Sequence, residues 1–97
     1  MSRASFLTSI TGRPRHATSI VFGVVRSAAA RHGVDWQQIY GPKRGADLCL
    51  ARDEACHDLR DMGMAYAKIG RMLNRDHSTI ISAVARHRSR ITRGDAA

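Results

Sequence analysis

The residues best suited to a chemical task are a polar run at positions 75–79, Arg-Asp-His-Ser-Thr, which directly precedes the β-branched pair Ile80 and Ile81. Each of the five polar side chains can form hydrogen bonds in defined directions. Asp76 stands where a helix N-cap belongs, since its carboxylate can accept from a backbone N–H two or three residues on. Capping explains Asp76 but not its polar neighbours. The run therefore indicates a helix start that also faces a partner.

The residues around this run have the pattern of a helix-turn-helix. A helix is predicted from Tyr66 to Leu73, a turn at Asn74 and Arg75, and a last helix from about His77 to Ile91. In such a motif the first residues of the second helix meet base edges, where a carboxylate can accept from cytosine N4 and a hydroxyl can serve either role. Apolar residues are expected to hold these helices against the core: Ile69, Met72, Leu73, Ile80, Ile81 and Val84.

The charge of the chain favours a polyanionic partner. Its 97 residues include 16 Lys and Arg against 8 Asp and Glu, a formal net charge of +8. The excess is concentrated between Lys68 and Arg93, where Asp76 is the only acid. We therefore expect nucleic acid as the partner, with basic side chains on its phosphates. The candidates for these backbone contacts are Lys68, Arg71, Arg86, Arg88, Arg90 and Arg93.

Helical segments are also predicted upstream, because apolar residues recur there at helical spacing between residues that start or stop helices. The expected fold is therefore all-α, a small helical domain with a helix-turn-helix. The upstream segments, each with the residue that starts or stops it, are residues 18–32 with Gly33, residues 36–40 with Asp35, and residues 46–62 with Gly63.

The segment from 46 to 62 has an apolar and an acidic face. The apolar residues expected in the core are Leu48, Leu50 or Ala51, Ala55, Leu59 and Met62. The acidic residues are Asp47, Asp53, Glu54, Asp58 and Asp61. They form either a solvated face or a docking surface for a protein partner. Cys49 and Cys56 lie about two helical turns apart, too far for a disulfide within this helix, and are expected to be reduced.

A chain of this length has room for one domain. Residues 1–16 are expected to form a flexible basic arm, because they contain several Arg and no acid and because Gly12 and Pro14 interrupt any regular pattern. The helix-turn-helix domain is expected over residues 17–93, followed by a tail at 94–97.

The sequence KIGRMLNRDHSTIISAVARH, residues 68–87, resembles the DNA-binding fourth domain of the bacterial replication initiator DnaA. The signature of that family is an Ile-Gly helix followed by Arg-Asp-His-Thr-Thr-Val. Arg75, Asp76, His77 and Thr79 match it position by position, Ile80 is apolar as the family requires, and Ser78 keeps the hydroxyl of a Thr. The similarity extends more weakly upstream and covers roughly residues 18–92.

The resemblance implies roles for individual residues. Asp76, His77 and Ser78 would read bases in the major groove, and Arg75 and Thr79 would contact phosphates. It also implies a basic loop that enters the adjacent minor groove. The residues at or near this loop are Lys43, Arg44 and Arg52. In the helix that follows, Asp53 and Glu54 replace a Pro and an Arg of the family pattern.

The chain contains no G-x-x-x-x-G-K-[ST] loop, so no nucleotide is expected as a ligand. It is similar in architecture to stand-alone, phage-derived regulators, which include DnaA-like activators of gene transfer agent clusters that work with a sigma-factor-like partner. The resemblance thus implies a sequence-specific transcription regulator that binds double-stranded DNA, an activator acting with a sigma-like factor or RNA polymerase. The alternatives are a replication-linked protein that binds or blocks DnaA-type sites and a DNA-binding subunit of a recombinase or packaging complex.

Other classes of function are disfavoured by spacing. Ser78 and His77 are adjacent on a helix and do not face one another, so no enzyme is expected. His57 follows Cys56 without a second ligand pair, so no metal or other cofactor is expected.

No apolar stretch is long enough for a signal peptide or membrane span, which favours the cytoplasm, in association with the nucleoid. An RNA-binding protein remains an alternative, although few aromatics are available for stacking. His87 is expected to be solvated or near phosphate.

Overall fold

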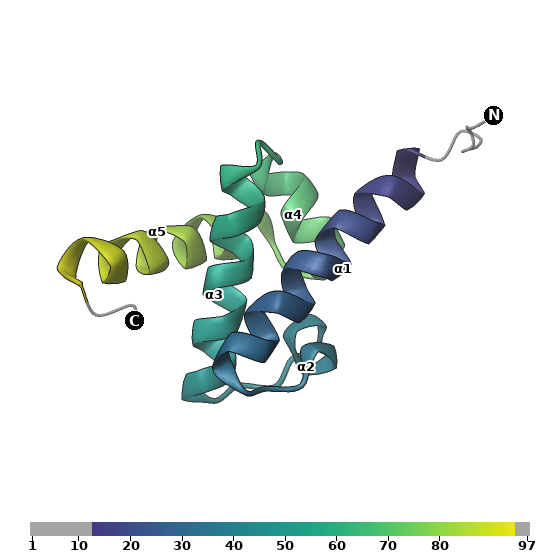
Figure 1. Cartoon of the computed structure of the whole chain (residues 1–97). Helices are drawn as coiled ribbons and strands as arrows, with labels where there is room; N and C mark the ends of the chain where they lie inside the picture. Colours follow the sequence, from purple (N-terminus) through teal and green to yellow (C-terminus); the bar gives the residue numbers. More distant parts are fainter. Residues whose placement is uncertain (1–12, 95–97) are drawn as a thin grey trace.

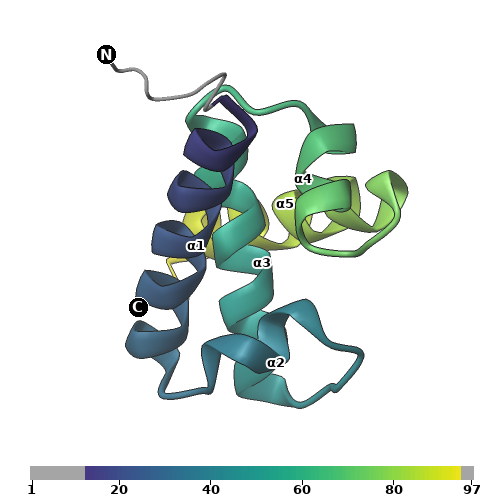
Figure 2. The same ribbon diagram turned by 90° about the vertical axis from the view of Figure 1, so that its right-hand side faces the viewer.

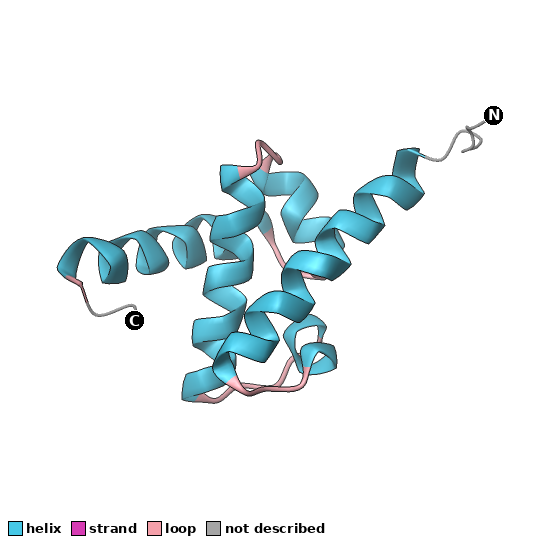
Figure 3. Ribbon diagram, in the orientation of Figure 1, coloured by secondary structure: helices cyan, strands magenta, loops and turns pink. Residues whose placement is uncertain are grey.

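Residues 13–94 are described by the computed structural model, and they form five helices joined by short loops, with no strand among them (Figures 1 and 3). The all-α fold class is confirmed. The helices are α1 (Arg13–His32), α2 (Trp36–Tyr40), α3 (Ala46–Asp61), α4 (Tyr66–Met72) and α5 (His77–Arg93).

Helix α3 is the centre of the packing, because α1 lies along one side of it and α5 crosses its other side (Figure 1). The short α2 closes one end of the α1–α3 pair, and α4 packs against α5 (Figure 2). The core between these helices is built from aliphatic residues, with Ile39, Leu59, Ile69, Leu73 and Ile80 the largest that are fully buried. All five helices contribute to this one core.

The helix ends agree with the local signals of the sequence. Asp35 caps α2, and its carboxylate accepts from the backbone N–H of Gln37 at 3.0 Å. Gly33 and Gly63 follow α1 and α3 with φ of +67° and +95°, values that favour glycine. Asn74, in the turn between α4 and α5, also has a positive φ, +58°. The predicted stops are therefore confirmed.

Helix α1 begins at Arg13, five residues before the predicted start at Thr18. Pro14 was read as a break in any regular pattern, but it lies in the first turn of α1. There its missing N–H would have no helical partner in any case, and its fixed φ suits a helix. Residues 13–16 of the predicted arm are thus helical, whereas residues 1–12 and the tail residues 95–97 lie outside the described part of the chain.

Two side chains expected in the core are exposed instead. Met62 is 60% exposed, because α3 ends at Asp61 and Met62 follows as its C-cap residue. Ile81 is 44% exposed. The buried face of α5 follows the i, i+3, i+4, i+7 spacing, so the residue directly after Ile80 turns about 100° away from it. The residues of this buried face are Ile80, Ala83, Val84 and His87.

His87 was expected on the solvated face, but it is buried beside His57, with ring centroids 4.7 Å apart. Burial lowers the pKa of His87, and the neighbouring His57 lowers it further. Cys49 and Cys56 are free, as predicted. Burial raises the pKa of the Cys56 thiol to about 12, so this cysteine behaves as an apolar core residue.

The turn of the helix-turn-helix packs directly on α4 at Gly70. The backbone N–H of Arg75 donates to the carbonyl oxygen of Gly70 at 2.7 Å. A Cβ added at Gly70 would lie 2.6 Å from the carbonyl oxygen of Arg75. Because that obstacle is backbone, it cannot rotate away. The close approach of the turn to α4 therefore requires glycine at this position.

We expect Gly70→Ala to lower the free energy of unfolding by about 1–3 kcal/mol, since the new methyl group must push the turn outward. Gly23→Ala is the matched control, because this helical glycine has open space at its Cβ position. It should raise the free energy of unfolding by about 0.5–1 kcal/mol through helix propensity. Urea unfolding followed by circular dichroism measures both. Equal stability of the two variants would contradict the close approach.

Candidate nucleic-acid interface

The polar run lies at the exposed start of α5, and Asp76 is its N-cap, as predicted. One carboxylate oxygen, Oδ2, accepts from the backbone N–H of Ser78 at 3.1 Å and from the Ser78 hydroxyl. These bonds, the hydroxyl first, lower the pKa of Asp76. The other oxygen, Oδ1, accepts no hydrogen bond from the described residues. Asp76 can therefore cap the helix and still accept from a partner, beside the exposed His77 and Thr79.

Arg52 holds the loop between α2 and α3 from inside. It is only 8% exposed, and its Nε donates to the carbonyl oxygen of Ile39 at 3.1 Å. Burial, with help from nearby Arg75, lowers the pKa of this guanidinium. The Nη2 group adds three further bonds to carbonyl oxygens: Gln38 at 2.9 Å, Lys43 at 3.0 Å and Gly41 at 3.3 Å. Arg52 thus faces inward and shapes the loop, whereas the resemblance placed it with the residues that enter the minor groove.

Lys43 and Arg44 occupy the outer side of this loop. Both are exposed, and neither side chain forms an ion pair within residues 13–94. The loop carries these two charges outward while Arg52 satisfies the carbonyl groups behind them. A basic loop with a fixed backbone and free side chains is therefore present where the sequence led us to expect it.

Arg75 connects this loop to the helix-turn-helix. Its Nη2 donates to the carbonyl oxygen of Gly41, and its Nη1 donates to that of Asn74 at 3.3 Å. Gly41 therefore accepts from two guanidinium groups, one from α3 and one from the turn before α5. The resemblance implied a phosphate contact for Arg75. The structure gives it a second role that sequence reasoning missed, because Gly41 lies 34 residues away.

Asp53 was expected on the acidic face of α3, as part of a solvated or docking surface, but it is 1% exposed. Arg86 binds it through Nε and Nη2, both at 3.0 Å, and the hydrogen bond raises the pKa of Arg86. Arg90 adds a contact from Nη2 at 2.8 Å. The sequence assigned Arg86 and Arg90 to phosphates, whereas here they tie α5 to α3. The Arg86 side chain nevertheless stays 53% exposed.

The loop and the start of α5 flank a hollow of about 660 Å³. Asp53 is the only acid in its lining. Such an excess of positive charge in a concave surface favours an anion over a neutral ligand. Five arginines line it: Arg44, Arg52, Arg75, Arg86 and Arg90.

Three further candidates for phosphate contact stand outside this hollow. Lys68 and Arg71 lie on α4 and Arg88 on α5, and all three are exposed. None of them forms an ion pair with another described residue. They add positive charge to the helix-turn-helix that no acid among residues 13–94 neutralises by an ion pair.

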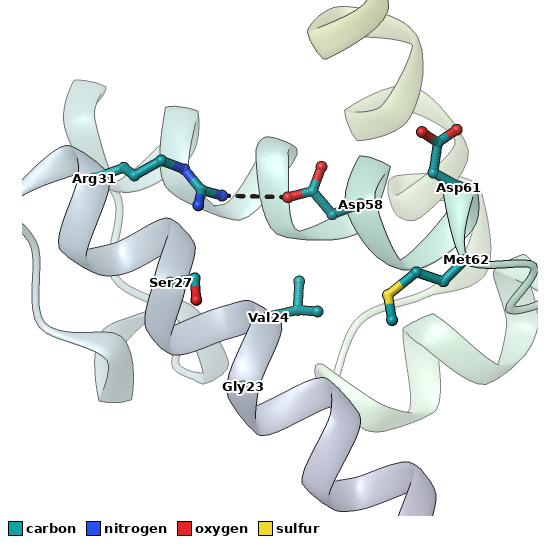
Figure 4. Close-up of a pocket in the computed structure, with 7 residues that line it drawn as sticks. All are labelled: Gly23, Val24, Ser27, Arg31, Asp58, Asp61 and Met62. Atoms are coloured by element: carbon teal, nitrogen blue, oxygen red, sulfur yellow. Dashed lines mark hydrogen bonds and ion pairs between the residues drawn. The ribbon is translucent and has the colours of Figure 1, made fainter.

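Two of the four remaining acids of α3, Glu54 and Asp58, are engaged with α1. Glu54 accepts from Arg31 and from His32, and these bonds lower its pKa although burial opposes the shift. The Nη2 of Arg31 also donates to Asp58 at 3.2 Å. This contact crosses a hollow between α1 and α3, with Asp61 at its far end (Figure 4). Two of the five acids thus join α3 to α1, and a third, Asp53, joins it to α5.

Residues 13–94 lack two other kinds of site. No group of three or more His, Cys, Asp or Glu side chains there is arranged to hold a metal ion. No described helix combines the length and the apolar character needed to cross a membrane.

Comparison with known proteins gives a family match and several relatives. The model of the bacterial DnaA protein helix-turn-helix family matches residues 23–86. The chain is 31% identical over 81 residues to chromosomal replication initiator protein DnaA 1 of Chlamydia muridarum, a match that covers 82% of this chain and 18% of that protein. It is 35% identical over 63 residues to DnaA 1 of Chlamydia trachomatis, covering 64% of this chain and 14% of that protein. No solved structure matches the chain significantly.

Arg52→Lys keeps the charge but cannot reach the same four carbonyl groups. We expect it to lower the free energy of unfolding by about 1–3 kcal/mol, because buried carbonyl groups lose their donors. Amide hydrogen exchange should also accelerate at Gly41 in this loop, because its N–H donates to the carbonyl oxygen of Gln38 at 3.2 Å and Arg52 holds both residues. Arg44→Lys is the matched control and should change neither quantity, since Arg44 is exposed. Loop exchange rates that are the same in both variants would argue against the role of Arg52.

Proposed function

The chain belongs to the bacterial DnaA helix-turn-helix family, a DNA-binding fold, and from this premise we propose that it is a sequence-specific reader of double-stranded DNA. One observation carries the proposal: Arg52 and Arg75 share the carbonyl oxygen of Gly41, so that the start of α5 and the basic loop stand at a fixed separation. Two elements that enter neighbouring grooves need such a fixed separation.

In the major groove, the exposed residues at the start of α5 would read base edges. The free Oδ1 of Asp76 would accept from cytosine N4, and His77 can donate or accept according to its tautomer. The Ser78 hydroxyl donates to Asp76, so its lone pairs remain available to a base donor. Capping and reading are therefore compatible in the same residues.

In the minor groove, Lys43 and Arg44 would enter from the loop, favoured by the negative potential of a narrow, AT-rich groove. The strand that separates the two grooves would then lie over the arginine-lined hollow. Thr79 and Arg75 line it and would bind phosphate oxygens there. Arg52 would act by positioning the loop. Outside the hollow, further phosphate contacts would come from Lys68, Arg71 and Arg88.

We propose that this reading regulates transcription, and that the chain is an activator which recruits a sigma-like factor or RNA polymerase. The surface available to such a partner is the α1–α3 face. Asp61 and the exposed Met62 lie there at the end of α3, beyond Asp58 (Figure 4). Most other acids of α3 are engaged within the fold, which narrows the docking surface to this end.

A second candidate is a replication-linked protein that binds or blocks DnaA-type sites. It is favoured by the relatives, which are chromosomal replication initiators, although the chain spans only 18% and 14% of the two relatives above. Mapping bound sites across the genome separates the two roles. Promoter sites with changed transcription would favour regulation, and clustering at the replication origin would favour the second role.

Selection of bound duplexes from a random DNA library, at physiological salt, tests the proposal. The wild-type chain should enrich one motif. Asp76→Asn keeps a capping side chain but replaces a carboxylate oxygen by a donor. At one position of the motif, it should change the relative affinity for the wild-type base and its competitors by roughly tenfold. Asp61→Asn, an exposed acid at the end of α3 that lies away from the basic loop, is the control and should leave the motif unchanged.

No enrichment would leave a basic fold that binds the backbone alone. If Asp76→Asn enriches the same motif with the same ranking, Asp76 is a cap only.

Arg44→Ala tests the loop. It should weaken binding most where the flanking minor groove is narrow and AT-rich, and less where GC pairs widen it. Arg26→Ala removes the same charge from an exposed site on α1 and should show no such dependence on the flank. Titrations against duplexes that differ only in the flank measure the effect. An equal loss on both flanks would demote Arg44 to a phosphate contact.

A further inference from the structure

His57 and His87 form a pair of stacked rings between α3 and α5, the two helices that cross in Figure 1. The ring centroids lie 4.7 Å apart, and the ring planes are tilted by 48°. His87 is 9% exposed and the side chain of His57 is 15% exposed, so water screens the contact only weakly. Neither residue lines the arginine-lined hollow. This histidine pair therefore belongs to the packing of α5 on α3 and not to the candidate DNA surface.

The charges nearest to His87 offer it no partner for a second proton. Glu54 and Asp58 of α3 favour its charged form only from a distance, and Arg90 of its own helix opposes it. His87 forms no hydrogen bond or ion pair with another residue of the 13–94 range. The Nδ1 of His57, by contrast, lies 3.3 Å from Oδ1 of Asp58, a contact that a protonated His57 can use as an ion pair.

The other helices near this interface bring charges that are already paired or exposed. On α1, Arg31 binds Glu54 and Asp58, and His32 binds Glu54. Helix α4 also packs against α5. Its charged side chains are exposed and form no ion pair with another described residue: Lys68 and Arg71. The only group in ring contact with His87 among residues 13–94 is thus a second imidazole.

We propose that the histidine pair is a pH-sensitive contact, which holds α5 on α3 at neutral pH and loosens in mild acid. Imidazole changes its charge between about pH 5 and 8, the range in which such a contact can act. When both rings carry a proton, two cations face each other in a largely buried site, and like charges at short range disfavour that state.

The direction of the effect follows from the position of His87. In the unfolded chain its ring has the ordinary histidine pKa of about 6.5. In the fold, burial and then the charge of His57 lower the pKa of His87. The unfolded chain therefore binds more protons than the folded chain in mild acid. The contribution of His87 to stability is complete above the ordinary pKa and is lost as the pH falls towards and through the lowered one.

NMR titration of the histidine ring protons between about pH 4.5 and 8 tests the contact directly. In the wild-type chain, the His87 ring should titrate below the ordinary histidine value. His57→Gln removes the neighbouring charge and keeps a polar side chain, so the midpoint of His87 should rise towards about 6.5. His77→Gln is the matched control, because it removes an exposed histidine from the same helix. It should leave the midpoint of His87 unchanged.

Urea unfolding at about pH 7.5 and pH 5.5 measures the consequence for stability. Only the change between the two pH values is compared, since a substitution can also alter stability at neutral pH. The wild-type unfolding constant should rise several-fold more at the lower pH than that of His87→Gln or His57→Gln. The two substitutions should be non-additive, because they remove the same contact. The double variant should therefore lose less of the pH dependence than the sum of the single variants.

Three outcomes would each overturn the inference. They are a His87 midpoint at or above the ordinary value, a midpoint that His57→Gln leaves in place, and losses of pH dependence that simply add. If His87→Gln does not fold, the NMR titrations of wild type and His57→Gln decide alone. None of these measurements involves DNA, so the result is independent of the proposed function.

Discussion

The carbonyl oxygen of Gly41 accepts from Arg52 and Arg75, and the shape of the candidate DNA-binding surface depends on this shared acceptor. A guanidinium group carries five N–H donors in a rigid fork, so one arginine can hold several backbone groups at once. Arg52 uses this property to fasten the end of α2 and the loop. Arg75 then fastens the same loop to the helix-turn-helix. A five-residue helix and an irregular loop thus become a rigid extension of α3.

Helix α3 organises both sides of this surface through two consecutive residues. Neighbours on a helix point about 100° apart, so Arg52 reaches the loop while Asp53 reaches α5. Asp53 is buried, yet its two oxygens bind Arg86 and Arg90, which offsets the cost of removing its charge from water. Its charge also favours the charged form of Arg52 beside it. The opposite charges of this pair let α3 fix loop and helix without an isolated buried charge.

The sequence predicts those features that depend on neighbours along the chain. The cap at Asp76, the glycine stops and the helix-turn-helix follow from residues within one or two turns of each other. The long-range pairs do not, because Asp53 and Arg86 are separated by 33 residues and nothing local distinguishes a buried acid from a solvated one. For the same reason the sequence prediction wrongly placed Ile81 in the core and His87 outside it, since the core face of α5 is set by how α3 crosses it. The sequence could have predicted the core face of α5 only if a histidine had been placed in the core, because that face consists of Ile80, Ala83, Val84 and His87.

The ion pairs that arginines form with Asp53 also affect how this surface would bind a phosphate. Arg86 binds Asp53 through Nε and Nη2, which leaves its Nη1 outside that pair and its side chain half-exposed. A guanidinium held in this way has already lost most of its rotamer freedom, so a phosphate contact costs less ordering than one made by a free surface arginine. The negative charge of Asp53 partly offsets the positive charge of Arg86, but the ion pair fixes the orientation of the guanidinium group. The residues that tie α5 to α3 therefore also prepare the wall of the hollow for an anion.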